Sequence, residues 1–167
     1  ACIPNYGAPA SKSAISDFCT LAERSTFDSV WTTDHIAVSR KYADPYGNIF
    51  ESLITLGYVA SQTEHVKLGT SIVVLPMRDP ILFAKQIASL DVLSDGRLIL
   101  GLGPGWMEDE FATLNSNFRE RVERLDEQIR LLRTLWSQEE PRFEGRFFSV
   151  IDAVFLPKPV QEGGPPI

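Results

Sequence analysis

The chain has few cysteines and no excess of positive charge. Its 167 residues include two cysteines, Cys2 and Cys19, which are too few and wrongly spaced for a structural zinc site or a disulfide scaffold. Lysine and arginine number 16 against 22 acidic residues, a formal charge of −6, and no basic stripe follows the chain. We therefore expect no metal centre, a reducing compartment and no nucleic-acid partner.

Long apolar runs are also missing. The run from Ser71 to Met77 is far shorter than the ~20 residues that a membrane-spanning helix needs, and no charged and then apolar leader opens the chain. We expect no membrane partner and a cytoplasmic protein. Because the chain begins with Ala1 and residues 1–5 have the pattern of a strand already under way, we also expect further residues upstream.

Strand and helix patterns alternate through a composition that is ordinary for a globular domain, with 44% hydrophobic and 23% charged residues. This alternation predicts an α/β fold with parallel strands, right-handed crossovers and covering helices. The expected strands are the end at 1–5 and the segments 27–33, 66–74 and 97–103. One expected helix begins at Ser11 or Ser13, and three others cover 53–60, 81–93 and 118–136. A short hairpin is expected over 143–150.

Four such β/α units make about half of a TIM (β/α)8-barrel, because a closed barrel needs about 250 residues. We therefore predict that residues 1–167 form a single domain, the N-terminal half of a barrel. An open four-stranded sheet would expose two edges and an apolar inner face. The missing C-terminal half, a second copy of the chain, or a rearranged sheet with helices on both faces could cover them.

Candidate functional residues lie where the predicted strands end, since parallel α/β barrels carry their active sites at the carboxyl ends of the strands. These ends are Asn5, Asp34-His35, Thr70–Ile72 and Gly103–Gly105, and we expect them to converge. The imidazole of His35 can hold or transfer a proton near neutral pH. The alternative is that His35 only caps a strand end or bonds to Asp34.

The glycine run 101–105 lacks the spacing that seats a dinucleotide pyrophosphate on a helix. It does permit close approach by a flat ligand, with Pro104 limiting its flexibility. Trp31 and Trp106 could stack on a ring system; we favour a core position for Trp31 and leave Trp106 open.

A structural role is the simpler interpretation for two other polar groups. His65 is expected where a helix ends, so its imidazole would interact favourably with the helix dipole. Glu108, Asp109 and Glu110 lie near a helix start, where carboxylates are favoured by the dipole and by free N–H groups. We interpret Asp109 and Glu110 as capping residues.

The run 91–106, followed by Glu110-Phe111, resembles the luciferase-like monooxygenase family. Further matching pieces extend along essentially the whole chain: 27–31 with Asp34-His35, 68–70 with Pro80, 84–86 and 157–161. The resemblance implies a TIM barrel in which a reduced flavin or the deazaflavin coenzyme F420 lies across the carboxyl ends of the strands. The implied chemistry is hydride transfer or oxygen activation.

Within this family the deazaflavin-using oxidoreductases look most similar. That similarity implies that His35 faces the cofactor ring as the catalytic proton relay or ring-positioning group. It also implies that Thr70, Ser71 and Ile72 form a bulge behind the ring, where we hypothesise a cis Ser71–Ile72 peptide, and that Gly103, Pro104, Gly105 and Trp106 line the cofactor. Some members place an acidic residue where Trp106 stands, which leaves the proton donor and the substrate class open.

Three functions follow from the resemblance. The first is an F420-dependent oxidoreductase acting on a small organic substrate, and the second is an FMN-dependent monooxygenase that uses molecular oxygen. The third is a non-catalytic half-barrel that binds a flavin or serves in assembly. The family grips the cofactor phosphate mainly with loops late in the barrel, beyond this chain, so full binding requires the remainder of the barrel. We also expect a homodimer.

Overall fold

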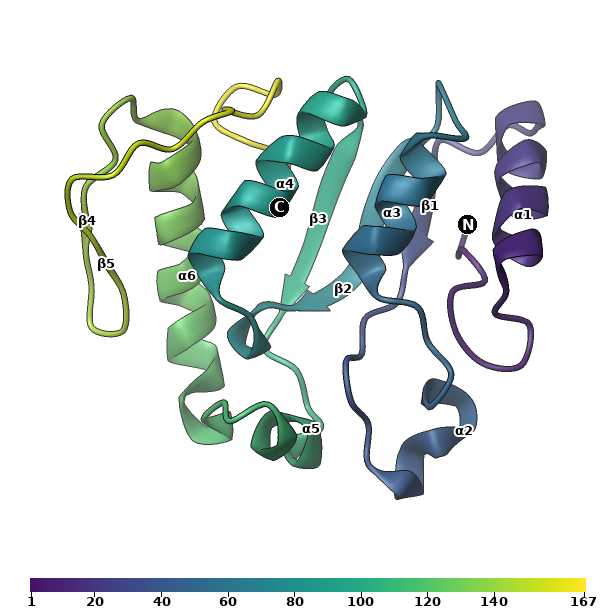
Figure 1. The fold of residues 1–167 in the computed structure, drawn as a ribbon, viewed down its shortest axis with the longest axis horizontal. Coiled ribbons are helices and arrows are strands. Elements are labelled where there is room, and N and C mark those ends of the chain that lie inside the picture. Colours follow the sequence, from purple (N-terminus) through teal and green to yellow (C-terminus); the bar gives the residue numbers. More distant parts are fainter.

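The computed structural model describes residues 1–167 as a parallel sheet covered by helices (Figure 1). The strands β1 (Ser29–Thr32), β2 (Lys67–Val74) and β3 (Leu98–Gly103) lie in the order β1-β2-β3, and both pairs are parallel. The strand end expected at residues 1–5 is reduced to one parallel bridge between Cys2 and Trp31. The α/β prediction with parallel pairing is therefore confirmed.

Helices connect the strands at the predicted positions. The four long ones are α1 (Lys12–Arg24), α3 (Ser52–Ala60), α4 (Pro80–Leu93) and α6 (Arg121–Ser137). Two short ones, α2 (Ala43–Tyr46) and α5 (Glu108–Thr113), follow β1 and β3, and single 3-10 turns occupy 40–42, 75–77 and 118–120. Local signals set the starts: the Ser11 hydroxyl accepts the Ala14 N–H of α1 at 3.1 Å, as expected of an N-cap.

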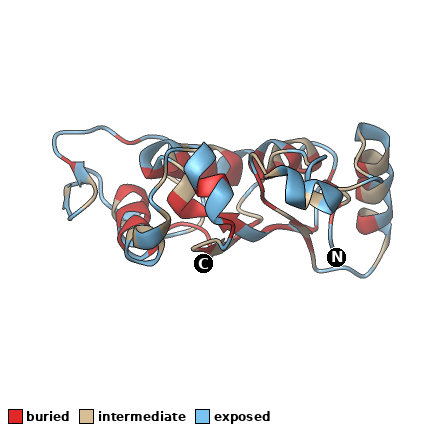
Figure 2. Cartoon of the chain, turned by 90° about the horizontal axis from the view of Figure 1, so that it is seen from below, coloured by how far each residue is buried: buried red, intermediate tan, exposed pale blue.

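The core lies between the helices and one face of the sheet. Alternate strand residues such as Val30, Leu68 and Leu98 are almost fully buried under α3 and α4, which lie on the same face (Figures 1 and 2). On the opposite face Cys2 and Lys67 are exposed. Helices cover only one face, so the rearranged sheet with helices on both faces is wrong.

Residues 143–167, which follow α6, pack back against the earlier elements. Strands β4 (Phe143–Glu144) and β5 (Ser149–Val150) form the predicted antiparallel hairpin. Near the end of the chain, the Leu100 N–H donates to the Pro166 carbonyl at 2.8 Å, so the last residues run beside the free edge of β3. None of the helices combines the length and the apolar character needed to cross a membrane.

Candidate functional site

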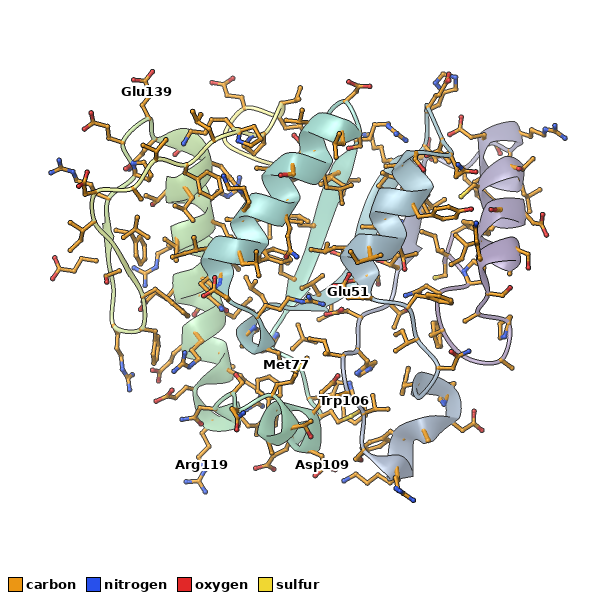
Figure 3. All side chains as sticks on the ribbon, in the orientation of Figure 1. Glu51, Met77, Trp106, Asp109, Arg119 and Glu139 are labelled. Carbon is orange, nitrogen blue, oxygen red and sulfur yellow. The ribbon has the colours of Figure 1, made fainter.

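The carboxyl ends of β1 and β2 and the loop after β3 enclose a cavity of about 200 Å³. Figure 3 places Trp106 at this end of the sheet, near Asp109. The lining residues come from the loops after β1 and β3, from the end of β2 and from the short helix α2: Thr33, Asp34, His35, Tyr46, Ser71, Ile72, Val74, Gly105 and Trp106. Five of the eight predicted site residues, His35, Ser71, Ile72, Gly105 and Trp106, therefore meet in one cavity.

The other three predicted site residues lie beside the cavity without lining it. Thr70 is fully buried, and its hydroxyl donates to the Gly101 carbonyl at 2.9 Å. Gly103 lies under Ile72, because a Cβ at position 103 would stand 1.9 Å from the Ile72 Cδ1 atom. Pro104 is half-buried and lies outside the lining. Thr70 and Gly103 thus shape the cavity from behind.

The segment between Thr70 and Val73 interrupts the regular pairing of β2 with β3. The register shifts there, and the Ser71–Ile72 peptide is cis, as hypothesised. Both side chains are exposed at the cavity, with Ile72 40% accessible. Opposite them, Gly105 has a positive φ of 76°, and a Cβ there would stand 2.5 Å from Val74. A bulged strand end facing a glycine loop fits the flat ring of a flavin or deazaflavin.

His35 is held by a buried carboxylate. Its Nδ1 atom lies 2.8 Å from Glu110 Oε2, while Oε1 of the same carboxylate accepts the N–H groups of Ile36 at 2.5 Å and Ala37 at 3.0 Å. Burial raises the pKa of Glu110, but these three hydrogen bonds outweigh it and bring the pKa below its usual value. The interpretation of Glu110 as a helix cap is therefore wrong, and His35 bonds to Glu110 rather than Asp34.

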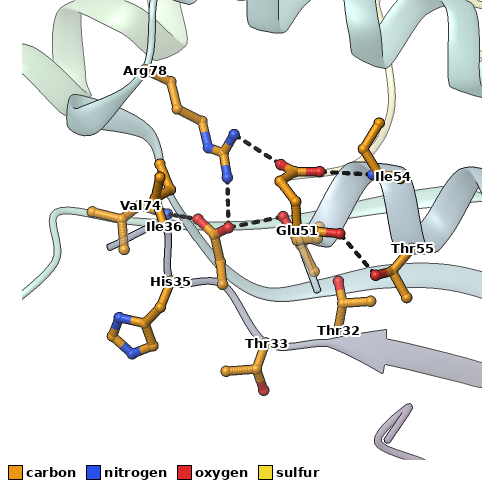
Figure 4. A network of polar contacts seen from close by, with 12 residues as sticks. Thr32, Thr33, His35, Ile36, Glu51, Ile54, Thr55, Val74 and Arg78 are labelled. Carbon is orange, nitrogen blue, oxygen red and sulfur yellow. Dashed lines mark hydrogen bonds and ion pairs between the residues drawn. The ribbon is translucent and has the colours of Figure 1, made fainter. Parts of the chain in front are cut away.

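Asp34 anchors the chain just after the end of β1. Its carboxylate accepts hydrogen bonds from the Ser52 hydroxyl at 2.9 Å, the Val74 N–H at 3.0 Å and the Arg78 guanidinium at 2.5 Å. Arg78 also pairs with Glu51 at 2.9 Å. The His35 ring points away from this network in Figure 4. Asp34 thus fixes the backbone that presents His35, and three donors already occupy its carboxylate.

Aromatic rings form the outer wall of the cavity. The Tyr46 ring lies 4.6 Å from the His35 ring between centroids, and Trp106 approaches His35 edge-on at 6.3 Å. Tyr42 meets Trp106 edge-on at 5.0 Å, and a Lys41–Asp109 ion pair of 2.6 Å joins the 3-10 turn at 40–42 to α5. Trp106 is 54% exposed, so it is a wall residue and not part of the core. None of the lining residues is lysine or arginine.

Three further residues have structural positions. The buried Asn5 side chain donates to the carbonyls of Thr33 at 2.8 Å and Phe50 at 3.1 Å, which ties the first strand end to the loops beside the cavity without lining it. Trp31 covers Gly69, where a Cβ would stand 2.3 Å from the ring, and is only half-buried. His65 is exposed and lies beyond the end of α3, so the predicted contact with the helix dipole is absent.

Sequence reasoning missed the most informative parts of this site. Glu110 was assigned to its own helix, although it reaches a loop 75 residues earlier in the chain to bind His35. Tyr46 lies in α2, a short helix that the sequence pattern does not predict, and no local pattern singles out Arg78. The carboxylate preceding Phe111 in the matching segment was the available signal for Glu110.

Comparison with known proteins identifies the family. Residues 3–167 match the family described as luciferase-like monooxygenase. The chain belongs to this family. It is 38% identical over 150 residues to an F420-dependent glucose-6-phosphate dehydrogenase of Kineococcus radiotolerans, covering 88% of this chain and 44% of that protein. A protein with the same name from Amycolatopsis mediterranei is 34% identical, covering 87% and 44%.

Solved luciferase-like structures share the fold. Monooxygenase RslO1 from Streptomyces bottropensis superimposes with a TM-score of 0.82 at 28% identity, over 95% of this chain and 48% of that one. An F420-dependent secondary alcohol dehydrogenase in complex with an F420-acetone adduct gives 0.79 at 24% identity, over 92% and 47%. The chain spans about half the length of the relatives it matches, and its fold is that of a half TIM barrel.

Proposed function

We propose that the protein containing this chain is a coenzyme F420-dependent oxidoreductase that transfers a hydride between the cofactor and a small organic substrate. The observation that carries this proposal is the cavity in which His35 meets the Ser71–Ile72 strand end. The 38% identity to a relative named as an F420-dependent dehydrogenase supports the choice of cofactor. The activity is proposed for the whole protein, since the chain spans about half of such relatives.

In this proposal the cofactor ring is held from two sides. Ser71 and Ile72, with Thr70 buried behind them, would support one side of it, and the loop that begins with Gly103 and Pro104 would present Gly105 and Trp106 to another. Ser71, Ile72, Gly105 and Trp106 all line the cavity, and Gly105 has no side chain to obstruct a flat ligand. When bound, F420 supplies the hydride acceptor or donor, and the protein supplies the orientation.

His35 is the proposed catalytic residue because oxidation of a hydroxyl-bearing carbon releases a proton together with the hydride. A neutral imidazole can accept that proton from the hydroxyl and return it in the reverse direction. Trp106 carries no group that titrates near neutral pH, and Asp34 already accepts three hydrogen bonds. Among the lining residues, His35 therefore has the side-chain type best suited to exchange a proton near neutral pH.

The cavity walls support a substrate class. Tyr46 and Trp106 present apolar ring faces, and no cationic side chain lines the cavity. We propose an uncharged organic substrate with a hydroxyl or carbonyl group in contact with this half of the site. A phosphorylated substrate would need its cations from elsewhere in the protein.

We also propose a cytoplasmic homodimer. Apolar side chains exposed on the outer helices, such as Ile54 on α3 and Leu82 on α4, support self-association. Light scattering on the purified protein measures the molar mass, and a monomeric mass at micromolar concentration would contradict the homodimer.

A second candidate is an FMN-dependent monooxygenase, favoured by the likeness to monooxygenase RslO1 at 28% identity. One experiment separates the two. The whole protein is mixed with F420 or reduced FMN and a panel of alcohols and ketones, and cofactor absorbance and oxygen consumption are recorded. Substrate-dependent F420 reduction supports the dehydrogenase, whereas transfer of one oxygen atom from O₂ to the substrate in the presence of reduced FMN, with the other released as water, replaces it with the monooxygenase. Binding without turnover would leave the non-catalytic alternative.

A further inference from the structure

The two oxygens of Glu110 have different partners, and this division carries an inference about His35. Oxygen Oε1 accepts two main-chain N–H groups, from Ile36 and Ala37, so it can serve only as an acceptor. Oxygen Oε2 faces His35 Nδ1 at 2.8 Å. The carboxylate is 1% exposed and its pKa is lowered, so it is ionised at neutral pH and accepts from Nδ1–H as well.

The second ring nitrogen of His35 has a different environment. Nε2 makes no hydrogen bond to the protein, and the ring lines the cavity between Tyr46 and Trp106. A neutral imidazole carries one proton, and a hydrogen bond at one nitrogen decides which nitrogen holds it. With the proton at Nδ1, Nε2 keeps a free lone pair on the cavity side.

We propose that Glu110 is a positioning residue that holds neutral His35 as the Nδ1–H tautomer, so that Nε2 is the atom that exchanges a proton with the substrate. The loop contacts of the same carboxylate also fix the backbone immediately after His35, because Ile36 and Ala37 directly follow it. The catalytic consequence rests on the proposed function, whereas the tautomer does not.

The chain contains a matched control in Glu127, which is 3% exposed. Its Oε1 accepts the N–H groups of Phe147 at 2.8 Å and Phe148 at 2.9 Å, and its Oε2 accepts the Arg146 N–H at 2.9 Å. The geometry repeats that of Glu110, with a third main-chain N–H in place of the imidazole. Glu127 lies outside the cavity lining.

The test substitutes glutamine at each position and observes the imidazole nitrogens by heteronuclear NMR. In the whole protein, the signal that is lost in His35→Asn identifies His35, and His65→Gln, an exposed change outside the site, removes the other histidine signal of this half. In Glu110→Gln the amide oxygen can keep the two main-chain N–H groups, so the NH₂ group faces Nδ1 and donates to it. We expect the proton to move to Nε2 in Glu110→Gln and to stay at Nδ1 in Glu127→Gln.

The wild-type spectrum keeps the test valid even if Glu110→Gln does not fold. Neutral His35 protonated at Nε2 in the wild type, or still protonated at Nδ1 in Glu110→Gln, would overturn the proposal. Turnover by the whole protein is the second readout, with a loss of about 10²–10⁴-fold expected for Glu110→Gln, as for a wrong tautomer in other catalytic histidines. A shifted tautomer with unchanged turnover would uphold the positioning role of Glu110 and contradict proton transfer by His35.

Discussion

Glu110 and Glu127 make the same kind of contact in two regions of the molecule, at the cavity and at the hairpin. Each is a buried carboxylate on a helix, and each gives one oxygen to two successive main-chain N–H groups of a distant loop. The regions differ in the third donor. At the hairpin it is the Arg146 N–H, which cannot give up its proton, and at the cavity it is an imidazole, which can move its proton to the other nitrogen.

This difference separates a structural carboxylate from one that can also influence chemistry. Burial and hydrogen-bond number are nearly equal for the two residues, and the pKa of both is lowered by hydrogen bonds that outweigh burial. Neither property distinguishes their roles. What distinguishes them is whether a partner has a second titrating atom that faces a cavity.

The largest expected effect is a loss of turnover when the Nε2 atom of His35 is removed. His35→Asn keeps an amide N–H that can donate to Glu110 but eliminates Nε2, so turnover by the whole protein should fall by about 10²–10⁴-fold. Steady-state kinetics measure the loss, and circular dichroism checks that the fold is retained. His65→Asn is the control, and equal losses in the two variants would contradict a specific role for His35.

The next largest effect is a difference in stability between Glu127→Gln and Glu110→Gln. In Glu127→Gln the amide NH₂ group faces the Arg146 N–H, and two donors without an acceptor should cost about 1–3 kcal/mol in the free energy of unfolding. In Glu110→Gln the imidazole can supply an acceptor, so the cost should be below about 1 kcal/mol. Urea unfolding measures both. A larger loss for Glu110→Gln would remove the contrast between the two regions.

Acid should weaken both regions together. Since the pKa of each glutamate is lowered in the folded state, its contribution to stability is fully present above the unfolded value of about 4.3 and is lost as pH falls through the folded pKa. Unfolding midpoints measured from neutral pH to about pH 3 should therefore fall, and less steeply in either glutamine variant. An unchanged slope in both variants would contradict ionised carboxylates.

The smallest expected effect is the loss of stability when the exposed ion pairs of Arg146, on the hairpin, are removed. The Arg146 side chain is 64% exposed and pairs with Glu123 and, at 3.9 Å, with Glu120. Arg146→Gln leaves the main-chain contact to Glu127 in place and should cost at most about 1 kcal/mol, a loss that salt should abolish. Urea unfolding at low and high salt measures it, and a salt-independent loss would implicate packing of Arg146 instead.

Much of the fold could be predicted because its signals are local. The β-branched runs of β1 and β2 and the apolar stripe of α6 lie in consecutive residues, and the observed bounds differ from the predicted ones by a few residues. The segment at 1–5 was harder, because a strand at the sheet edge pairs through contacts that its own residues do not specify. Only Cys2 forms a bridge there.

The site was predictable only in part, because some of its contacts join distant segments and leave no local signal in the sequence. His35, Ser71 and Trp106 could be placed at one end of the sheet because parallel strands end together. The partner of His35 could not, since a glutamate at a helix start has the same local pattern whether it caps its helix or reaches another loop. Glu110 makes the second choice because Ile36 and Ala37 present free N–H groups beside the imidazole.

The glycine beneath Ile72 offers a handle for protein engineering. Because Gly103 does not line the cavity, a methyl group added there would act on ligands only by displacing the Ile72 side chain, whose Cδ1 atom occupies that space. Such a substitution would change the shape of the cavity, and with it the substrate preference, through Ile72 alone. His35, Glu110 and the aromatic rings that face the ligand would keep their native chemistry.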